Sequence, residues 1–170
     1  MLQGEFPLEC PECLPACSPD LGEAKGTLEC GAMPPFDSAR FTLWLPQILC
    51  AVFLAILFLQ SGLDKVVDWK GNLGWLTGHF AKSPLKGLVT PMLAVITLME
   101  LAAGALSAAG AVALVASGNP FLAYLGAVLS ALSLLALFFG QRMAKEYAGA
   151  AVLVPYFVVA LAGVYLLRLS

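Results

Sequence analysis

The sequence predicts an all-α integral membrane protein, an antiparallel bundle of four transmembrane helices preceded by an irregular N-terminal arm. Of the 170 residues, 60% are hydrophobic and only 12% are charged, and the mean hydropathy is +0.87. A water-soluble domain of this size cannot cover so much apolar surface, so lipid is the expected solvent for much of the chain. The apolar residues are also gathered into four long runs. We therefore expect two regions, an arm over residues 1–40 and a transmembrane domain over residues 41–170.

The arm differs from the rest of the chain in charge and composition. It carries seven acids against two bases, whereas residues 41–170 carry four acids against seven bases. It is rich in Pro, Gly, Glu and Cys without sustained periodicity, which favours irregular structure. Its first 20 residues lack the basic and apolar regions of a signal peptide. No clustered basic surface or nucleic-acid motif occurs, which argues against DNA or RNA as a partner.

Four apolar runs predict the spans, at about residues 41–61, 87–115, 121–139 and 149–167. A helix needs roughly 20 residues to cross a bilayer, and each run approaches or exceeds that length. Backbone groups in hydrocarbon must be paired within the segment, and the runs lack the alternation of a barrel, so helices are expected. Pro46 lies near the start of the first run, where a helix tolerates proline best.

The connections between spans predict which helices are neighbours. Residues 117–120 and the polar turn at 141–148 are short, so the helices that they join should pack against each other. In the longer first connection Leu73, Trp75, Leu76 and Phe80 alternate with Thr77, His79 and Lys82. That pattern suits a helix lying on the membrane surface. His79 is the single histidine of the chain, and we expect it to be solvated.

The distribution of basic residues predicts the orientation in the bacterial inner membrane. Six bases lie in or beside the first and third connections, and three lie on the other side: Lys65, Lys70, Lys82, Lys86, Arg142 and Lys145 against Lys25, Arg40 and Arg168. The positive-inside rule then places both of those connections in the cytoplasm and both termini outside it.

The arm holds four cysteines, Cys10, Cys13, Cys17 and Cys30, whereas Cys50 stands alone in the first span. Disulfides are the favoured interpretation for an extracytoplasmic segment, and four cysteines allow three pairings. A metal site and a redox-active Cys-x-x-Cys pair stay open as alternatives, although the spacing matches no zinc or iron–sulfur pattern strictly, so no metal is assigned. For Cys50 the expectation is a small apolar filler.

Glu100 lies near the middle of the second span, where a carboxylate costs a few kcal/mol or more. At helical spacing it shares a face with Thr97, Gly104, Ser107 and Ala111, a strip of small residues that lets another helix approach closely. Gly126, Ser130 and Ser133 form a matching strip on the third span, and we expect Glu100 to point toward it or into a small polar cavity. The nearest cations, Lys65 and Arg142, lie at helix ends about three turns away, too distant for direct contact unless their long side chains reach inward or water intervenes.

The sequence therefore predicts a protonated Glu100 held by hydrogen bonds, with two interpretations open. Glu100 is either a structural group or the candidate catalytic residue, an acid that handles protons or contacts a ligand.

Two polar sets lie at the ends of the first and third spans. Gln60, Asp64, Lys65 and Asp68 follow a helical register, and Arg142, Lys145 and Glu146 follow the third span. They could pair across the bundle, or they could line a polar mouth for a quinone headgroup or a partner subunit. Pairing is the commoner use of interfacial charges and is favoured.

Three segments resemble the DoxX family of small membrane proteins: FLQSGLDKVVDW at 58–69, LMELAAGALSAAGA at 98–111 and GQRMAKEYAGAA at 140–151. The resemblance covers roughly residues 42–168 and rests on Gly62 with Lys65, Glu100 with Gly104, and the stretch from Arg142 to Gly149. It implies a four-helix bundle that accompanies redox systems such as thiosulfate:quinone oxidoreductases, methylamine utilisation and thiol-oxidant defence. The cysteine-bearing arm departs from the family, whose members commonly begin close to the first helix.

The resemblance implies a quinone-linked or thiol-linked redox role, with quinone as the candidate cofactor. The first hypothesis is an accessory subunit of a membrane redox complex, with the lipid bilayer and other membrane or extracytoplasmic subunits as partners. The second is an enzyme that passes electrons between extracytoplasmic thiols and quinone. The third is a small proton or solute carrier around Glu100, which ranks last because four helices without an evident inverted repeat leave little room for alternating access.

Overall fold

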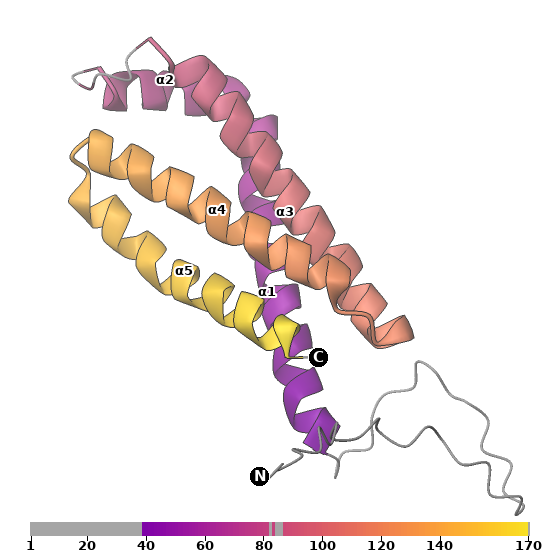
Figure 1. Ribbon diagram of the computed structural model, residues 1–170. Helices are drawn as coiled ribbons and strands as arrows, with labels where there is room; N and C mark the ends of the chain where they lie inside the picture. Colours follow the sequence, from indigo (N-terminus) through magenta and orange to yellow (C-terminus); the bar gives the residue numbers. More distant parts are fainter. Residues whose placement is uncertain (1–38, 82, 84–86, 170) are drawn as a thin grey trace, which may run out of the picture.

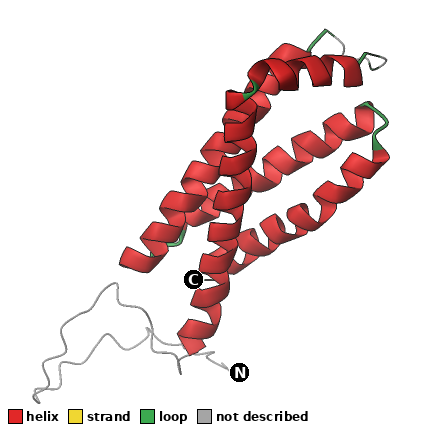
Figure 2. Cartoon of the chain, turned by 180° about the vertical axis from the view of Figure 1, so that it is seen from behind, coloured by secondary structure: helices red, strands yellow, loops and turns green. Residues whose placement is uncertain are grey.

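The computed structural model describes residues 39–81, 83 and 87–169, and these residues form five helices (Figure 1). The helices are α1 (Ala39–Val67), α2 (Trp69–His79), α3 (Val89–Ser117), α4 (Phe121–Met143) and α5 (Tyr147–Arg168). The described part contains no strand (Figure 2). The predictions for Cys10, Cys13, Cys17 and Cys30 lie outside the described residues and stay predictions.

The all-α four-helix bundle is confirmed, since α1, α3, α4 and α5 are each long and apolar enough to cross a membrane. The protein is accordingly a multi-pass membrane protein in its architecture. The predicted bounds hold within a few residues except at the end of the first span. There α1 continues six residues beyond Ser61, to Val67, and this extension brings Lys65 into the bundle.

The helices pack in the order α1, α3, α4, α5, with α3 between α1 and α4. Both views show α1 and α3 as a long crossed pair, while α4 and α5 form a hairpin beside it (Figures 1 and 2). The beginning of α1 and the end of α5 lie at one end of the bundle. The α4–α5 turn and α2 lie at the other, with α2 crossing that end at a steep angle to α1 (Figure 1).

The short helix α2 begins where Asp68 caps it, because the Asp68 carboxylate accepts a hydrogen bond of 3.1 Å from the Gly71 amide. This cap satisfies an amide that the first turn of a helix leaves unpaired. Directly after α2, the side chain of Phe80 is buried. The prediction of a helix in the first connection is confirmed.

Close helix contacts depend on glycine at two levels of the α1–α3 pair. A Cβ added at Gly62 would come within 2.8 Å of the Leu101 side chain, and one at Gly104 within 2.8 Å of the Leu59 backbone nitrogen. Small residues of this kind allow helix backbones in a membrane to approach closely. The two contacts fix the register in which Ser61 and Lys65 face Glu100.

The predicted small-residue strips of α3 and α4 do meet. Ser107 and Ser130 are fully buried, and a Cβ added at Gly126 would collide with Ser107. The two helices are joined by residues 118–120, and Gly118 has a φ of 67°, a left-handed conformation that favours glycine. The Asn119 side chain accepts a hydrogen bond of 2.9 Å from the Phe121 amide and so starts α4.

Candidate functional site

A charged pair lies inside the bundle, between α1 and α3. Glu100 of α3 has no exposed surface, and the Lys65 ammonium nitrogen lies 2.8 Å from its Oε2 atom. The same nitrogen donates a hydrogen bond of 3.1 Å to Glu100 Oε1. A buried charge in a bundle is expected to be paired, and this contact meets that requirement.

Ser61, one turn before Lys65 on α1, completes the cluster. Its hydroxyl accepts a hydrogen bond of 2.7 Å from Lys65 Nζ and lies 3.3 Å from Glu100 Oε1, to which it donates. Lys65 Nζ also lies 3.3 Å from the Ser61 carbonyl oxygen. An ammonium has three hydrogens to donate. Ser61 and Glu100 together therefore use the donor capacity of Lys65.

The sequence places Lys65 at a helix end about three turns from Glu100, within reach only if its long side chain extends inward or water intervenes. The structure has the direct contact, through the extended lysine side chain. Because α1 continues to Val67 and runs antiparallel to α3, residue 65 lies opposite residue 100, and the long lysine side chain reaches the carboxylate. Among the described residues, the partners of Glu100 come from α1, Lys65 and Ser61, and not from the predicted strip on α4. The protonated state of Glu100 stays a prediction.

The energetic consequence of the pair follows from its burial. Removing both charges from water is costly, and the mutual attraction roughly offsets this cost when geometry is good. Removing one partner is different, because it leaves the other charge buried without compensation. The pair therefore couples α1 to α3 strongly while adding little net stability over an apolar contact.

A pocket of about 160 Å³ lies beneath α2, between α2, α3 and α4, with Lys65 in its wall. Its lining is mostly aliphatic, aromatic and thioether side chains, with three polar residues. The lining residues are Lys65, Leu76, His79, Phe80, Met92, Leu93, Val95, Ile96, Met99, Ala136, Leu137, Gly140 and Gln141. An apolar cavity with a few convergent polar groups is the usual form of a small-molecule site.

Two of the three polar residues have buried atoms without a partner. Nε2 of His79 and Oε1 of Gln141 are both buried and make no hydrogen bond within the described residues. The His79 ring stacks on Trp75 at 4.6 Å between centroids and meets Phe80 edge-on at 5.4 Å. The expectation that His79 is solvated is therefore wrong for Nε2, because His79 ends α2 at the wall of the pocket, with its ring against Trp75 and Phe80.

Gln141 was not selected from the sequence as a site residue, although it begins the predicted polar turn. The structure extends α4 to Met143, so Gln141 belongs to the last turn of a membrane helix instead of a solvated loop. A glutamine directly after an apolar run, at a helix end that faces another helix, is the signal that could have identified it.

The remaining predicted residues of the two polar sets lie outside the pocket. Asp64, Gln60, Lys145 and Arg142 are exposed, and Glu146 is half-buried. The Arg142 guanidinium lies 4.8 Å from the centre of the Tyr147 ring. Among the described residues, the ion pair is the one between Lys65 and Glu100. The polar residues at the end of α1 therefore do not form the favoured ion pairs with those at the end of α4.

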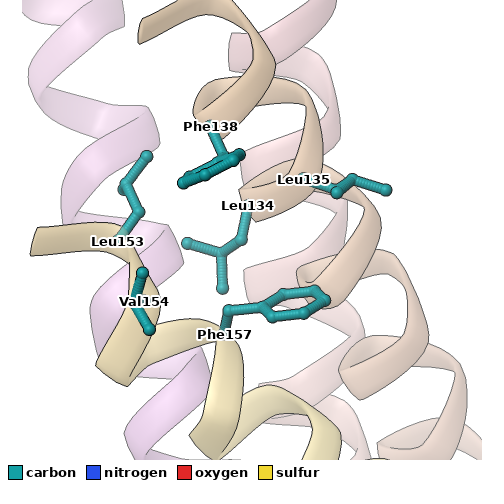
Figure 3. A pocket seen from close by; sticks show the side chains of 6 residues that line it. All are labelled: Leu134, Leu135, Phe138, Leu153, Val154 and Phe157. Carbon is teal, nitrogen blue, oxygen red and sulfur yellow. The ribbon is translucent and has the colours of Figure 1, made fainter. Parts of the chain in front are cut away.

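A second pocket, of about 190 Å³, lies between α4 and α5 (Figure 3). Its six lining residues are apolar throughout: Leu134, Leu135, Phe138, Leu153, Val154 and Phe157. The side chains of Phe138 and Phe157 stand at opposite sides of Leu134 in this view (Figure 3). Without a polar group to orient a ligand, this pocket suits a hydrocarbon chain and offers no chemistry.

Cys50 is the one cysteine in the described part of the chain. Its thiol lies 3.4 Å from the Val159 carbonyl oxygen, to which it donates, and its sulfur occupies the space beside Gly163 of α5. This position agrees with the predicted role as a small filler. Among the described residues, no group of three or more His, Cys, Asp or Glu side chains could hold a metal ion.

Comparison with known proteins gives no match, either to models of protein families or to curated proteins or solved structures. The resemblance to the DoxX family therefore stays a prediction from the three quoted segments. The arrangement of residues in the site has to carry the functional argument.

Proposed function

We propose that this protein is an accessory membrane subunit of a quinone-linked redox complex, and that the pocket beneath α2 receives the quinone headgroup. The observation that carries the proposal is an apolar pocket at one end of a membrane bundle with the buried Lys65–Glu100 pair beside it. A quinone has a polar ring on a long hydrocarbon tail, so its site needs apolar walls and a small polar region at membrane depth.

The size and position of the pocket support a ring-shaped ligand. A dry cavity of about 150 Å³ can bind benzene, and this pocket has about 160 Å³. Val95 and Ala136 of its lining are exposed on α3 and α4. In a membrane that exposed edge would face the acyl chains, which gives a hydrocarbon tail a way out while the ring stays inside.

The proposal assigns electron transfer to a partner subunit. The described residues provide one thiol, Cys50, and it packs between α1 and α5. This chain would contribute the binding of quinone, and its partner would contribute the redox centre. The closeness of the Lys65–Glu100 pair to the pocket adds a fixed dipole near the ring, which can favour one redox state of the bound headgroup.

Gentle purification from the native membrane tests the proposal. The expected result is copurification of at least one redox subunit, together with isoprenoid quinone in an organic extract of the sample. Ala136→Trp should fill the mouth of the pocket and remove the quinone, whereas Ala105→Trp, also at an exposed alanine of a membrane helix, should retain it. A quinone content that is equal in the two variants, or zero in the wild type, would reject the proposed site.

We also propose that α2 and the α4–α5 turn face the cytoplasm, in a bacterial inner membrane. These two segments share one end of the bundle (Figure 1), which agrees with the grouping of basic residues in the sequence. Lys65 is paired with Glu100 inside the bundle and is no longer counted as a surface charge. Five of the six basic residues in or beside the first and third connections then support a cytoplasmic position for this end. An alkaline phosphatase fused after Ser170 should be active, and an inactive fusion combined with an active cytoplasmic reporter would reverse the orientation.

A further inference from the structure

The end of α4 and the turn that follows it carry two basic side chains without an acidic partner. Arg142, in the last turn of α4, and Lys145, in the turn, are both exposed, and neither belongs to an ion pair among the described residues. The Arg142 guanidinium lies 4.8 Å from the centre of the exposed Tyr147 ring. Glu146 is half-buried and is the one acid of residues 141–147. This end of the α4–α5 hairpin therefore presents a net positive charge.

The backbone conformation of Lys145 is a second feature of this turn. Lys145 has a φ of 63°, which among the described residues makes it the non-glycine residue with a positive φ. The Glu146 amide donates to the Gln141 carbonyl at 2.9 Å, and the Lys145 amide donates to the Arg142 carbonyl at 3.2 Å. Hydrogen bonds of this kind end a helix, and glycine is the usual residue at the left-handed position. A lysine where glycine would be less strained indicates a use for its charge.

Two apolar spaces lie beside each other on the hydrocarbon side of this basic end. An open groove of about 540 Å³ runs along α4, lined by Leu132, Leu135, Ala136, Phe138, Phe139 and Arg142. The apolar pocket between α4 and α5 shares Leu135 and Phe138 with the groove (Figure 3). From residue 132 to residue 142 a helix rises about 15 Å, which is half the thickness of the hydrocarbon core of a bilayer. The groove thus has the length of an acyl chain in one leaflet, with an arginine at its end.

We infer that this end of α4 binds an anionic phospholipid. Arg142 and Lys145 hold its phosphate, and its two acyl chains occupy the groove on α4 and the pocket between α4 and α5. A guanidinium suits phosphate oxygens because it can donate two parallel hydrogen bonds, and basic residues at a membrane surface attract anionic headgroups. The lining of this site differs from that of the pocket beneath α2 except at Ala136. The inference does not rest on quinone binding.

Native mass spectrometry of the purified full chain, titrated with lipid in detergent, tests the inference. The three probes are dioleoyl phosphatidylglycerol, dioleoyl phosphatidylcholine with the same chains but no net charge, and oleoyl lysophosphatidylglycerol with one chain. The first phosphatidylglycerol should bind about tenfold more tightly than phosphatidylcholine, because each surface base strengthens the attraction about fivefold and Glu146 offsets part of it. Equal affinities for the two dioleoyl lipids would overturn the inference.

Arg142→Gln connects the preference to the basic end of α4. It should reduce the preference for phosphatidylglycerol over phosphatidylcholine to about twofold. Arg168→Gln is the matched control, because it also removes an exposed base from the last turn of a membrane helix, at the other end of the bundle. The control should keep the preference of the wild type. Equal losses in the two variants would mean that overall charge, and not this site, selects the lipid.

Lys145→Gly separates lipid binding from a structural role. Glycine relieves the left-handed conformation, so the thermal midpoint of the lipid-free protein should stay the same or rise. The preference for phosphatidylglycerol should nevertheless fall to about twofold. A variant that keeps the full preference would overturn the assignment of the phosphate to this turn. Because this substitution is expected to preserve the fold, it also tests the site if Arg142→Gln does not fold.

The second acyl chain is tested by filling the pocket between α4 and α5. Val154→Trp should lower the affinity for phosphatidylglycerol to that for the one-chain lipid, and should leave the one-chain lipid unaffected. Val152→Trp, at an exposed valine of α5 outside the pocket lining, should change neither affinity. If Val154→Trp binds phosphatidylglycerol as the wild type does, the placement of the second chain is overturned.

Discussion

The two helix pairs of this bundle solve the problem of membrane packing in opposite ways. In the α1–α3 pair, Gly62 and Gly104 allow close approach, and the fully buried Glu100 is paired with the partly exposed Lys65 between the helices. In the α4–α5 pair, leucine and phenylalanine side chains line an apolar pocket between the helices (Figure 3). One interface holds a polar cluster, and the other holds an apolar pocket.

The difference indicates what each interface can tolerate. Lipid offers no hydrophobic drive for helix association, so packing and polar contacts hold membrane helices together. The α1–α3 pair depends on a few specific atoms and should be sensitive to single changes. The α4–α5 pair depends on dispersion contacts spread over many side chains, and individual changes there should have small effects.

Breaking the buried pair should produce the largest effect. Glu100→Leu leaves the Lys65 ammonium without its carboxylate partner, and removing one member of a buried pair costs about 3–5 kcal/mol. Because the Lys65 side chain is 19% exposed, we expect a loss at or below the lower end of that range. Steric-trap unfolding in bicelles measures this free energy directly. Glu100→Gln keeps the shape and the hydrogen bond from Ser61 but removes the negative charge, so it should fall between the wild type and Glu100→Leu.

The double variant Lys65→Met with Glu100→Leu supplies the control for that experiment. Replacing a whole buried ion pair by apolar residues is often close to neutral, so the double variant should regain most of the lost stability. Additive losses, with the double variant less stable than either single one, would mean that the two charges do not compensate each other. A wild-type stability for Glu100→Leu alone would contradict the pairing of Lys65 with Glu100.

The next effect in size concerns the tight packing itself. Gly104→Ala places a methyl group against the Leu59 backbone, so α1 and α3 must move apart, at a cost of about 1–3 kcal/mol. Gly140→Ala on α4 is the matched control, because its added methyl group would lie 3.8 Å from the Phe80 ring, an ordinary contact. Thermal unfolding in detergent should rank Gly104→Ala well below Gly140→Ala, and equal midpoints would show that close approach of α1 and α3 is not required.

The two helix pairs also differ in how much of their structure could be predicted from the sequence. Hydropathy and loop length identified four spans and their neighbours, because apolar runs of membrane length leave few alternatives. The face of α3 that holds Glu100 and Ser107 was also predictable, since small residues recur there at helical spacing. These features are periodic and local.

The partner of Glu100 and the pocket were not predictable in this way. The partner of Glu100 depends on where α1 ends, and the sequence after Ser61 is amphipathic, so the apolar run stops before the helix does. Six further helical residues carry Lys65 from an expected surface position to an internal one. His79 and Gln141 line one pocket because α2 crosses the end of the bundle, which is a property of the tertiary structure.

The smallest expected effect on stability is at the turn between α4 and α5, where the Arg142 guanidinium lies over the Tyr147 ring. Both residues are exposed, and a cation–π contact in such a position stabilises by only about 0.5–1 kcal/mol. Arg142→Gln should therefore lower the unfolding free energy by no more than that amount, and Arg142→Lys, which keeps the charge, should recover part of it. The comparison with Glu100→Leu is informative because each variant removes one charge. If the Arg142 variant were as destabilising as the Glu100 variant, the cost of losing a charge would not depend on burial, and the contrast between the polar cluster of the α1–α3 interface and the exposed α4–α5 turn would be wrong.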